Sequence, residues 1–216
     1  MERKVYYSFH EIPFDEHSYG YGRTGIKFSG REIKELIISI IVLSLAFSIA
    51  MSSPHYSLFY AIFPMAFIAV VTAFAFHEIS HKYAGMKFGY WSEYRMFPQG
   101  LLFALLLSFV GFVFAAPGAV TIYGNPSREE NGIISAAGPS ANIVIASLFL
   151  AISTMVTGVA GNAISFIASI NAFLAFFNLV PLGPLDGRKV FSWNIGIWGG
   201  MIAVSMILLA LSWGII

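Results

Sequence analysis

The sequence contains an uncharged apolar run, residues 59–76, that continues without a break into the polar pentapeptide HEISH at 77–81. An apolar run of this length predicts a helix that spans a membrane. Residues four apart share one face of a helix, so His77 and His81 point the same way, one turn apart. The pattern HExxH is typical of zinc hydrolases, in which the two imidazoles bind the ion and the glutamate handles the proton of a water molecule. The segment therefore predicts a metal site on a membrane helix.

The alternative for this motif is a chance match on a helix that has already left the membrane, with ordinary interfacial side chains. Ionisable groups at lipid depth are costly, so they are expected to face a protein interior that offers them partners. The continuity of the apolar run with His77, Glu78 and His81 therefore favours the metal site.

The composition excludes several classes of protein. Of the 216 residues, 57% are hydrophobic and only 11% are charged, which predicts an all-α polytopic membrane protein. The net charge is +1 and there is no basic run, so we expect no nucleic-acid partner. The chain has no cysteine, so any zinc ion must be bound by histidine and carboxylate side chains.

The apolar stretches and the polar segments between them divide the chain. We expect a juxtamembrane segment at 1–35 and one transmembrane domain at 36–216, with its core at about 59–190. Apolar stretches predict crossings at 36–51, 59–85, 133–156, 163–180 and about 195–216. The stretch 101–122 is also apolar, but Gly111, Pro117 and Gly118 interrupt it, so it either crosses the membrane or enters and returns.

A catalytic zinc site needs a third protein ligand, and few acidic residues can supply it. Glu93, Glu129 and Glu130 lie in polar segments with basic neighbours, where a solvated charge is expected. Asp186 instead follows a segment rich in proline and glycine at a helix end, where irregular backbone at membrane depth is tolerated if it lines a cavity. A plain turn at Asp186 and Gly187 is the alternative.

Three motifs taken together resemble the site-2 protease family of intramembrane zinc metalloproteases. They are HEISH on one helix, AAGPSAN at the start of a later helix, and FNLVPLGPLDG after a third, and the resemblance covers roughly residues 74–190. The resemblance implies that His77, His81 and Asp186 bind one zinc ion. It also implies that Glu78 is the catalytic carboxylate.

The same resemblance suggests roles for two asparagines. Asn178 is expected near the substrate or the developing oxyanion. Gly138, Pro139 and Asn142 match a motif that we interpret mainly as close helix packing, and Asn142 is a second candidate for a polar contact with the substrate.

One position departs from the family pattern. The family motif often has two glycines after the aspartate, whereas Gly187 is followed here by Arg188, which alters the loop without removing a ligand. There is no sequence for a PDZ or CBS regulatory domain, so we expect a minimal member of the family.

Topology gives an independent test of the third ligand. His77, His81 and Asp186 can reach one ion only if they lie toward the same membrane face. A full crossing at 101–122 would put Asp186 on the opposite face, whereas a segment that enters and returns brings the three together. This choice also gathers four basic residues on one side, which the positive-inside rule makes cytoplasmic: Arg95, Arg128, Arg188 and Lys189.

We therefore expect a multi-pass cell-membrane protein with five spanning helices and a re-entrant, hairpin-like segment at 101–122. Six full crossings is the alternative. The active site would lie toward the cytoplasmic side. The partners would be the lipid bilayer and the helix of a membrane-protein substrate.

The function implied by the resemblance is hydrolysis of peptide bonds in or near the transmembrane helices of membrane proteins. Such helices must unwind before attack, and an irregular 101–122 segment could offer a strand edge that holds the unwound chain. The main alternative is a membrane transporter or metal-binding protein without proteolytic activity, because intramembrane histidine and aspartate also mark ion paths. The absence of an internal repeat argues against a transporter. A different metalloprotease with Glu129 or Glu130 as third ligand is a further alternative.

Overall fold

The computed structural model describes residues 25–113 and 116–214, so most of the expected juxtamembrane segment lies outside the described residues. Within the described ranges, five helices are long and apolar enough to cross a membrane, which confirms five spans rather than six. They are α1 (Gly30–Ser52), the continuous helix Tyr56–Lys87, α5 (Arg128–Ser153), α6 (Gly158–Leu179) and α8 (Ile195–Ser212).

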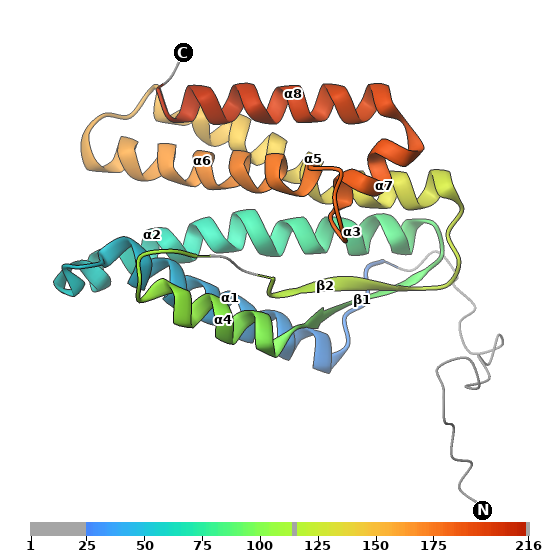
Figure 1. Ribbon diagram of the computed structural model, residues 1–216, viewed down its shortest axis with the longest axis horizontal. Coiled ribbons are helices and arrows are strands. Elements are labelled where there is room, and N and C mark those ends of the chain that lie inside the picture. Colours follow the sequence, from blue (N-terminus) through green and yellow to red (C-terminus); the bar gives the residue numbers. More distant parts are fainter. Residues whose placement is uncertain (1–24, 114–115, 215–216) are drawn as a thin grey trace, which may run out of the picture.

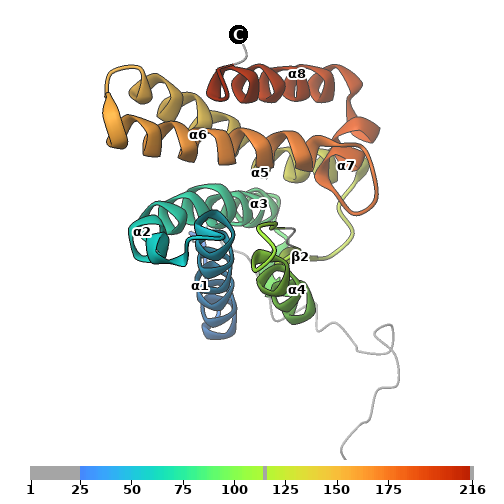
Figure 2. The same ribbon diagram turned by 60° about the vertical axis from the view of Figure 1, so that its left-hand side comes forward.

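The helix that carries HEISH runs through the middle of the molecule. On one side lie α5, α6 and α8, and on the other lie α1 and the segment that follows the HEISH helix, an arrangement seen in both views (Figures 1 and 2). The central helix comprises the short 3₁₀ turn Tyr56–Leu58, α2 (Phe59–Val70), a π-helical turn η2 (Val71–Ala75) and α3 (Phe76–Lys87). The π turn ends at Ala75, two positions before His77. Such turns are rare and often lie at functional sites.

The segment after α3 forms a hairpin that returns to the HEISH helix, as expected for a segment that does not cross. Strand β1 (Trp91–Met96) leads into α4 (Pro98–Ser108), and the chain comes back as strand β2 (Gly118–Tyr123). The strands pair antiparallel, from Trp91 opposite Tyr123 to Met96 opposite Gly118. With 11 residues, α4 is about 16 Å long, too short to cross a hydrocarbon core of about 30 Å.

The small sheet qualifies the expectation of an all-α protein, because the fold is mostly helical but contains these two strands. The expectation that Glu93 is a solvated charge in a polar segment was wrong. Glu93 lies within β1, is only 5% exposed and pairs with Arg95. The charge is tolerated there because it is paired locally.

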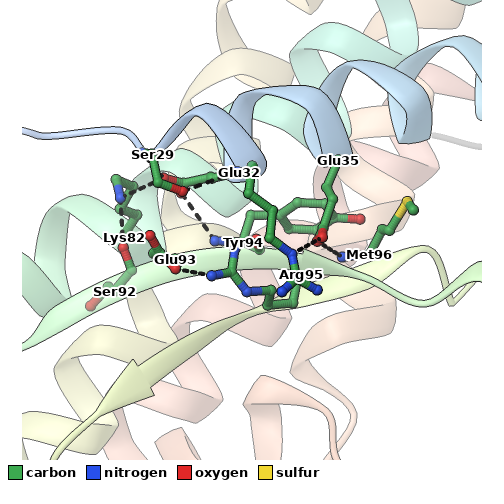
Figure 3. A network of polar contacts seen from close by, with 10 residues as sticks. Ser29, Glu32, Glu35, Lys82, Ser92, Glu93, Tyr94, Arg95 and Met96 are labelled. Carbon is green, nitrogen blue, oxygen red and sulfur yellow. Dashed lines mark hydrogen bonds and ion pairs between the residues drawn. The ribbon is translucent and has the colours of Figure 1, made fainter. Parts of the chain in front are cut away.

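Two glutamates of α1 bind the outer edge of β1 (Figure 3). Glu32 Oε1 accepts a hydrogen bond from the backbone N–H of Tyr94, and Glu35 Oε2 accepts one from that of Met96, both at 3.0 Å. Residues 94 and 96 therefore point their N–H groups away from β2. The two glutamates are consequently packed against the sheet, and both are buried.

A buried lysine completes the same edge. Lys82 Nζ donates to the carbonyl of Ser92 at 2.6 Å and to Glu32 Oε2 at 2.9 Å (Figure 3). The Lys82 and Glu32 side chains are each 1% exposed. Side chains of α1 and α3 therefore bind this edge of β1, and the opposite edge of the sheet is formed by β2.

The apolar core fixes this hairpin against the central helix. Its buried members come from α1, the central helix, β1 and α4: Leu43, Val70, Phe74, Tyr94, Leu101 and Ala104. The Tyr94 hydroxyl lies 2.9 Å from Ser39 Oγ of α1 and donates to the carbonyl of Pro117 at 2.9 Å. One side chain thus ties α1 to the segment that leads into β2.

The remaining helix, α7 (Asp186–Trp193), was not expected from the sequence. It joins α6 to α8 and lies against the beginning of α5 (Figure 1). Gly132 of α5 permits this contact, because a Cβ atom there would be 2.3 Å from the Cβ of Trp193. The first residue of α7 is Asp186, so the packing of this short helix places that side chain.

Candidate metal centre

The structure brings the three expected ligands together. The Nε2 atoms of His77 and His81 are 3.0 Å apart, and Asp186 Oδ2 lies 3.0 Å from His81 Nε2 and 3.3 Å from His77 Nε2. Both histidines are buried on α3, and Asp186 is supplied by the start of α7. His81 and Asp186, which are 105 positions apart in the sequence, therefore point at a common centre.

The other nitrogen of each imidazole has its own acceptor. His77 Nδ1 is 2.7 Å from Asn142 Oδ1, and His81 Nδ1 is 2.8 Å from the carbonyl oxygen of Ile134. Asn142 Nδ2 donates to the carbonyl of Ala73 at 2.9 Å, which fixes its oxygen toward His77. Because both Nδ1 atoms face acceptors, they carry the protons of the neutral rings, and both Nε2 atoms carry lone pairs.

Two nitrogen lone pairs and a carboxylate oxygen thus converge on one point, an arrangement that a cation satisfies. Aspartic acid side chains are ionised at neutral pH, so the oxygen that Asp186 contributes belongs to a carboxylate. Ligands around a tetrahedral zinc ion at about 2.0–2.1 Å stand about 3.3–3.4 Å from one another, close to the 3.0, 3.0 and 3.3 Å found here. The donor set and its spacing fit zinc.

Glu78 is buried beside these ligands and contacts the sheet. Its Oε2 accepts a hydrogen bond from the backbone N–H of Val120 at 3.0 Å. Glu78, which lies between the two predicted histidine ligands in the sequence, is therefore bonded to β2. This bond places the outer edge of the hairpin next to the HEISH helix.

The position of Gly138 shows why the AAGPSAN motif of α5 has a glycine at this point. A Cβ atom at this position would be 2.3 Å from His81 Nε2 and 2.7 Å from His77 Nε2. Only a residue without a side chain lets α5 approach the imidazoles this closely. The expectation of close helix packing at Gly138 agrees with this geometry.

Asn142 lies in a buried polar chain that reaches the π turn. In addition to its bonds to His77 and Ala73, its Nδ2 is 3.3 Å from Asn171 Oδ1, and Asn171 Nδ2 donates to Thr72 Oγ1 at 3.1 Å. Ala73 and Thr72 belong to the π turn. The substrate contact suggested for Asn142 stays a prediction, and Asn171 had no expected role. An asparagine within each of two apolar helices was the available signal.

Two other residues considered for the site, Asn178 and Glu130, form their hydrogen bonds with other groups than the three ligands. Asn178 is half-buried on α6, and its Nδ2 donates to the carbonyl of Leu174 at 3.0 Å, so its role stays a prediction. Glu130 accepts hydrogen bonds from the Tyr90 hydroxyl and the Ser127 N–H in the first turn of α5. Across residues 25–113 and 116–214, the one group of histidine and acidic side chains that converges closely enough for a metal is His77, His81 and Asp186.

Two curated proteins are similar to this chain. One, named "Putative zinc metalloprotease MJ0611", from Methanocaldococcus jannaschii, is 38% identical over 195 residues, which cover 87% of this chain and 98% of that protein. The other, named "Putative zinc metalloprotease YwhC", from Bacillus subtilis, is 28% identical over 154 residues, covering 60% of this chain and 68% of that protein. No family model and no solved structure matches the chain.

Proposed function

We propose that this protein hydrolyses peptide bonds within or beside the transmembrane helices of membrane-protein substrates. The chain belongs to the site-2 protease family of zinc metalloproteases. The observation that carries the proposal is the convergence of two imidazole lone pairs and one carboxylate between α3 and α7. A zinc peptidase needs such a set of three protein ligands with a fourth position left for reaction.

His77, His81 and Asp186 would hold one zinc ion. When bound, the ion supplies a Lewis acid that polarises a carbonyl group and makes water acidic near neutral pH. The protein fixes the two imidazoles through Asn142 and Ile134, so that both Nε2 atoms are already turned inward. This preorganisation lowers the cost of gathering the ligands.

Glu78 would act as the general base and then as the general acid. Its carboxylate would accept a proton from the attacking water and pass it to the leaving amine. Asn178 would lie near the substrate and donate a hydrogen bond to the developing oxyanion. Asn142 would act through His77, because that imidazole is its contact in the site.

The outer edge of β2 would hold the unwound substrate. Val120 is opposite Tyr94 in the pair of strands, and its N–H points to Glu78 rather than to β1. By the alternation of antiparallel strands, Gly118 and Ile122 also turn their backbone groups away from β1. A substrate segment added here as a strand would lie beside Glu78, and its carbonyl groups would no longer be bonded within a helix.

The site would face the cytoplasm. Arg95, Arg128, Arg188 and Lys189 lie in the segments that flank the metal centre, whereas the loops near Ser53 and Gly158 carry no lysine or arginine. Residues 36–216 would form the protease domain, with the core at about 59–190, and 1–35 would be a juxtamembrane segment.

The test is zinc-dependent cleavage by the full chain. The protein, purified in detergent and reconstituted with a membrane-spanning substrate, is expected to bind one zinc ion and to cut the substrate. Chelation should stop cleavage, and added zinc should restore it. Glu78→Gln should retain zinc and lose cleavage, since an amide cannot accept the proton.

Two results would overturn the proposal. One is cleavage by Glu78→Gln protein at the wild-type rate. The other is zinc-loaded wild-type protein that cuts none of a panel of membrane-spanning substrates but moves ions across vesicles, the outcome expected of a transporter.

A further inference from the structure

A second pocket lies outside the metal centre, where α5 begins and α7 passes. Its volume is about 280 Å³, and its lining residues come from the first turn of α5, the loop after α6, and α7: Arg128, Asn131, Gly183, Arg188, Lys189 and Ser192. None of the three metal-ligand candidates lines it, and neither does Glu78. Nothing in the proposed reaction uses this pocket.

The pocket carries three positive charges and no acidic lining residue. The guanidinium of Arg128 donates to the carbonyl of Ser192, another lining residue, and is thereby held at the pocket. Arg188 and Lys189 are exposed, and among the described residues no carboxylate forms an ion pair with either. A concave surface with unneutralised charge of one sign attracts ions of the other sign.

Two acidic residues near the lining residues in sequence are bonded elsewhere, and a third, Glu129, is exposed and does not line the pocket. Asp186 points to His77 and His81. Glu130 is bonded to the Tyr90 hydroxyl and to the N–H of Ser127. The remaining cations, amide and hydroxyl are the side chains that bind phosphate groups in proteins.

The surroundings indicate where the anion would come from. Figure 1 shows α7 at the end of the bundle where α5 and α8 begin. Apolar side chains near the lining residues in sequence are exposed there: Leu182 at 66%, Phe191 at 40% and Ile195 at 64%. Exposed apolar side chains next to lysine and arginine at the end of spanning helices are typical of the membrane interface, where lipid phosphates lie.

We propose that this pocket binds the phosphate group of an anionic phospholipid, with Arg128, Arg188 and Lys189 as its positive ligands. The acyl chains would extend along the exposed apolar side chains beside it. Because α7 begins with Asp186, and Lys189 follows one helical turn later, a bound lipid would also hold the helix that carries the proposed third metal ligand.

The experiment measures lipid retention by the full chain in neutral detergent, using native mass spectrometry with added phosphatidylglycerol or phosphatidylcholine. We expect one tightly bound phosphatidylglycerol per chain and no comparable phosphatidylcholine. The double variant Arg188→Gln, Lys189→Gln should weaken phosphatidylglycerol binding roughly 30-fold, from the usual contribution of two cations at an anionic surface.

Two matched variants control for net charge and for folding. Lys34→Gln, Lys87→Gln removes two exposed cations elsewhere and should leave lipid binding unchanged. Arg188→Lys, Lys189→Arg keeps the charges and should retain the lipid even if the glutamine variant is unstable. Equal binding of both lipids, or equal losses in the two glutamine variants, would overturn the proposal. So would full occupancy by inorganic phosphate with no gain from the lipid, which would identify a site for free anions.

Discussion

A Cβ atom on residue 138 would stand 2.3 Å from Nε2 of His81, so Gly138 and a proposed zinc ligand leave no space for even a methyl group. Gly138→Ala must therefore displace the imidazole or push α5 away from α3. We expect at least a tenfold loss of zinc affinity, in the range found when the surroundings of metal ligands are disturbed, measured by competition with a chelator.

Gly199→Ala is the matched control for that change. Gly199 also lies within a helix, α8, but a Cβ atom there would meet nothing within 4 Å. Alanine should be neutral or slightly stabilising at this position, because it has the higher helix propensity. Gly138→Ala protein that binds zinc as tightly as the wild type would show that the imidazoles do not need their present positions.

The hydrogen bond from His77 to Asn142 leads to a second prediction. Asn142→Ala removes the acceptor of the Nδ1 proton and the donor to the Ala73 carbonyl, so His77 is free to rotate or to change tautomer. Loss of such a partner typically lowers metal affinity by about 10- to 100-fold. Zinc titration of the purified variant measures this without any substrate.

Asn178→Ala provides the contrast. Its side chain is bonded within α6 and not to the three ligands, so zinc affinity should not change. If Asn178 donates to the oxyanion, kcat should fall by about 10²- to 10³-fold. Weakened zinc binding in Asn178→Ala, or wild-type zinc affinity in Asn142→Ala, would contradict the roles given to the two asparagines.

The convergence of His77, His81 and Asp186 could be predicted from the sequence, through helix spacing for the two histidines and through the family resemblance for the aspartate. The spacing of His77 and His81 on a helix fixes their shared face, and a returning segment at 101–122 is what allows Asp186 to reach them. The contact between His77 and Asn142 could not be predicted in this way. It depends on how α5 is rotated about its axis relative to α3, and the packing of Gly138 determines that rotation.

Two kinds of feature were not predicted from the sequence: a short helix, and buried charged side chains whose hydrogen-bond partners are distant in the sequence. An eight-residue helix such as α7 has too few turns to show a periodic pattern. Glu32 and Glu35 resemble surface charges before a membrane helix, yet both are buried, because the N–H groups of Tyr94 and Met96 are donated by a strand about 60 residues later. No local pattern contains that partnership.

The buried pair of Lys82 and Glu32 leads to a prediction about stability. Lys82→Met would leave the Glu32 carboxylate buried without its cation and would also remove the donor to the Ser92 carbonyl. Breaking one side of such a pair usually costs about 3–5 kcal/mol of unfolding free energy, measurable by unfolding in detergent. Lys87→Met, at an exposed position of the same helix, should change stability by less than about 0.5 kcal/mol.

The double variant Glu32→Gln, Lys82→Met separates charge from packing. Glutamine can still accept the N–H of Tyr94, and no unpaired charge remains in the interior. We expect the double variant to be more stable than Lys82→Met alone. Equal stability of the two would mean that the lost bond to Ser92, rather than the unpaired carboxylate, accounts for the destabilisation.

The outer edge of β2 leads to the last prediction, at Ile122. Its N–H points away from β1, so proline there removes a group available to an added substrate strand and breaks no bond between β1 and β2. Losing one main-chain hydrogen bond should lower kcat/KM by about 2- to 10-fold, with zinc content unchanged. Ile122→Ala keeps the N–H and reports the effect of the side chain alone. Thr121→Pro, which removes an N–H that faces β1, should instead unfold the hairpin. Cleavage by Ile122→Pro that matches Ile122→Ala would mean that the substrate does not pair with this edge.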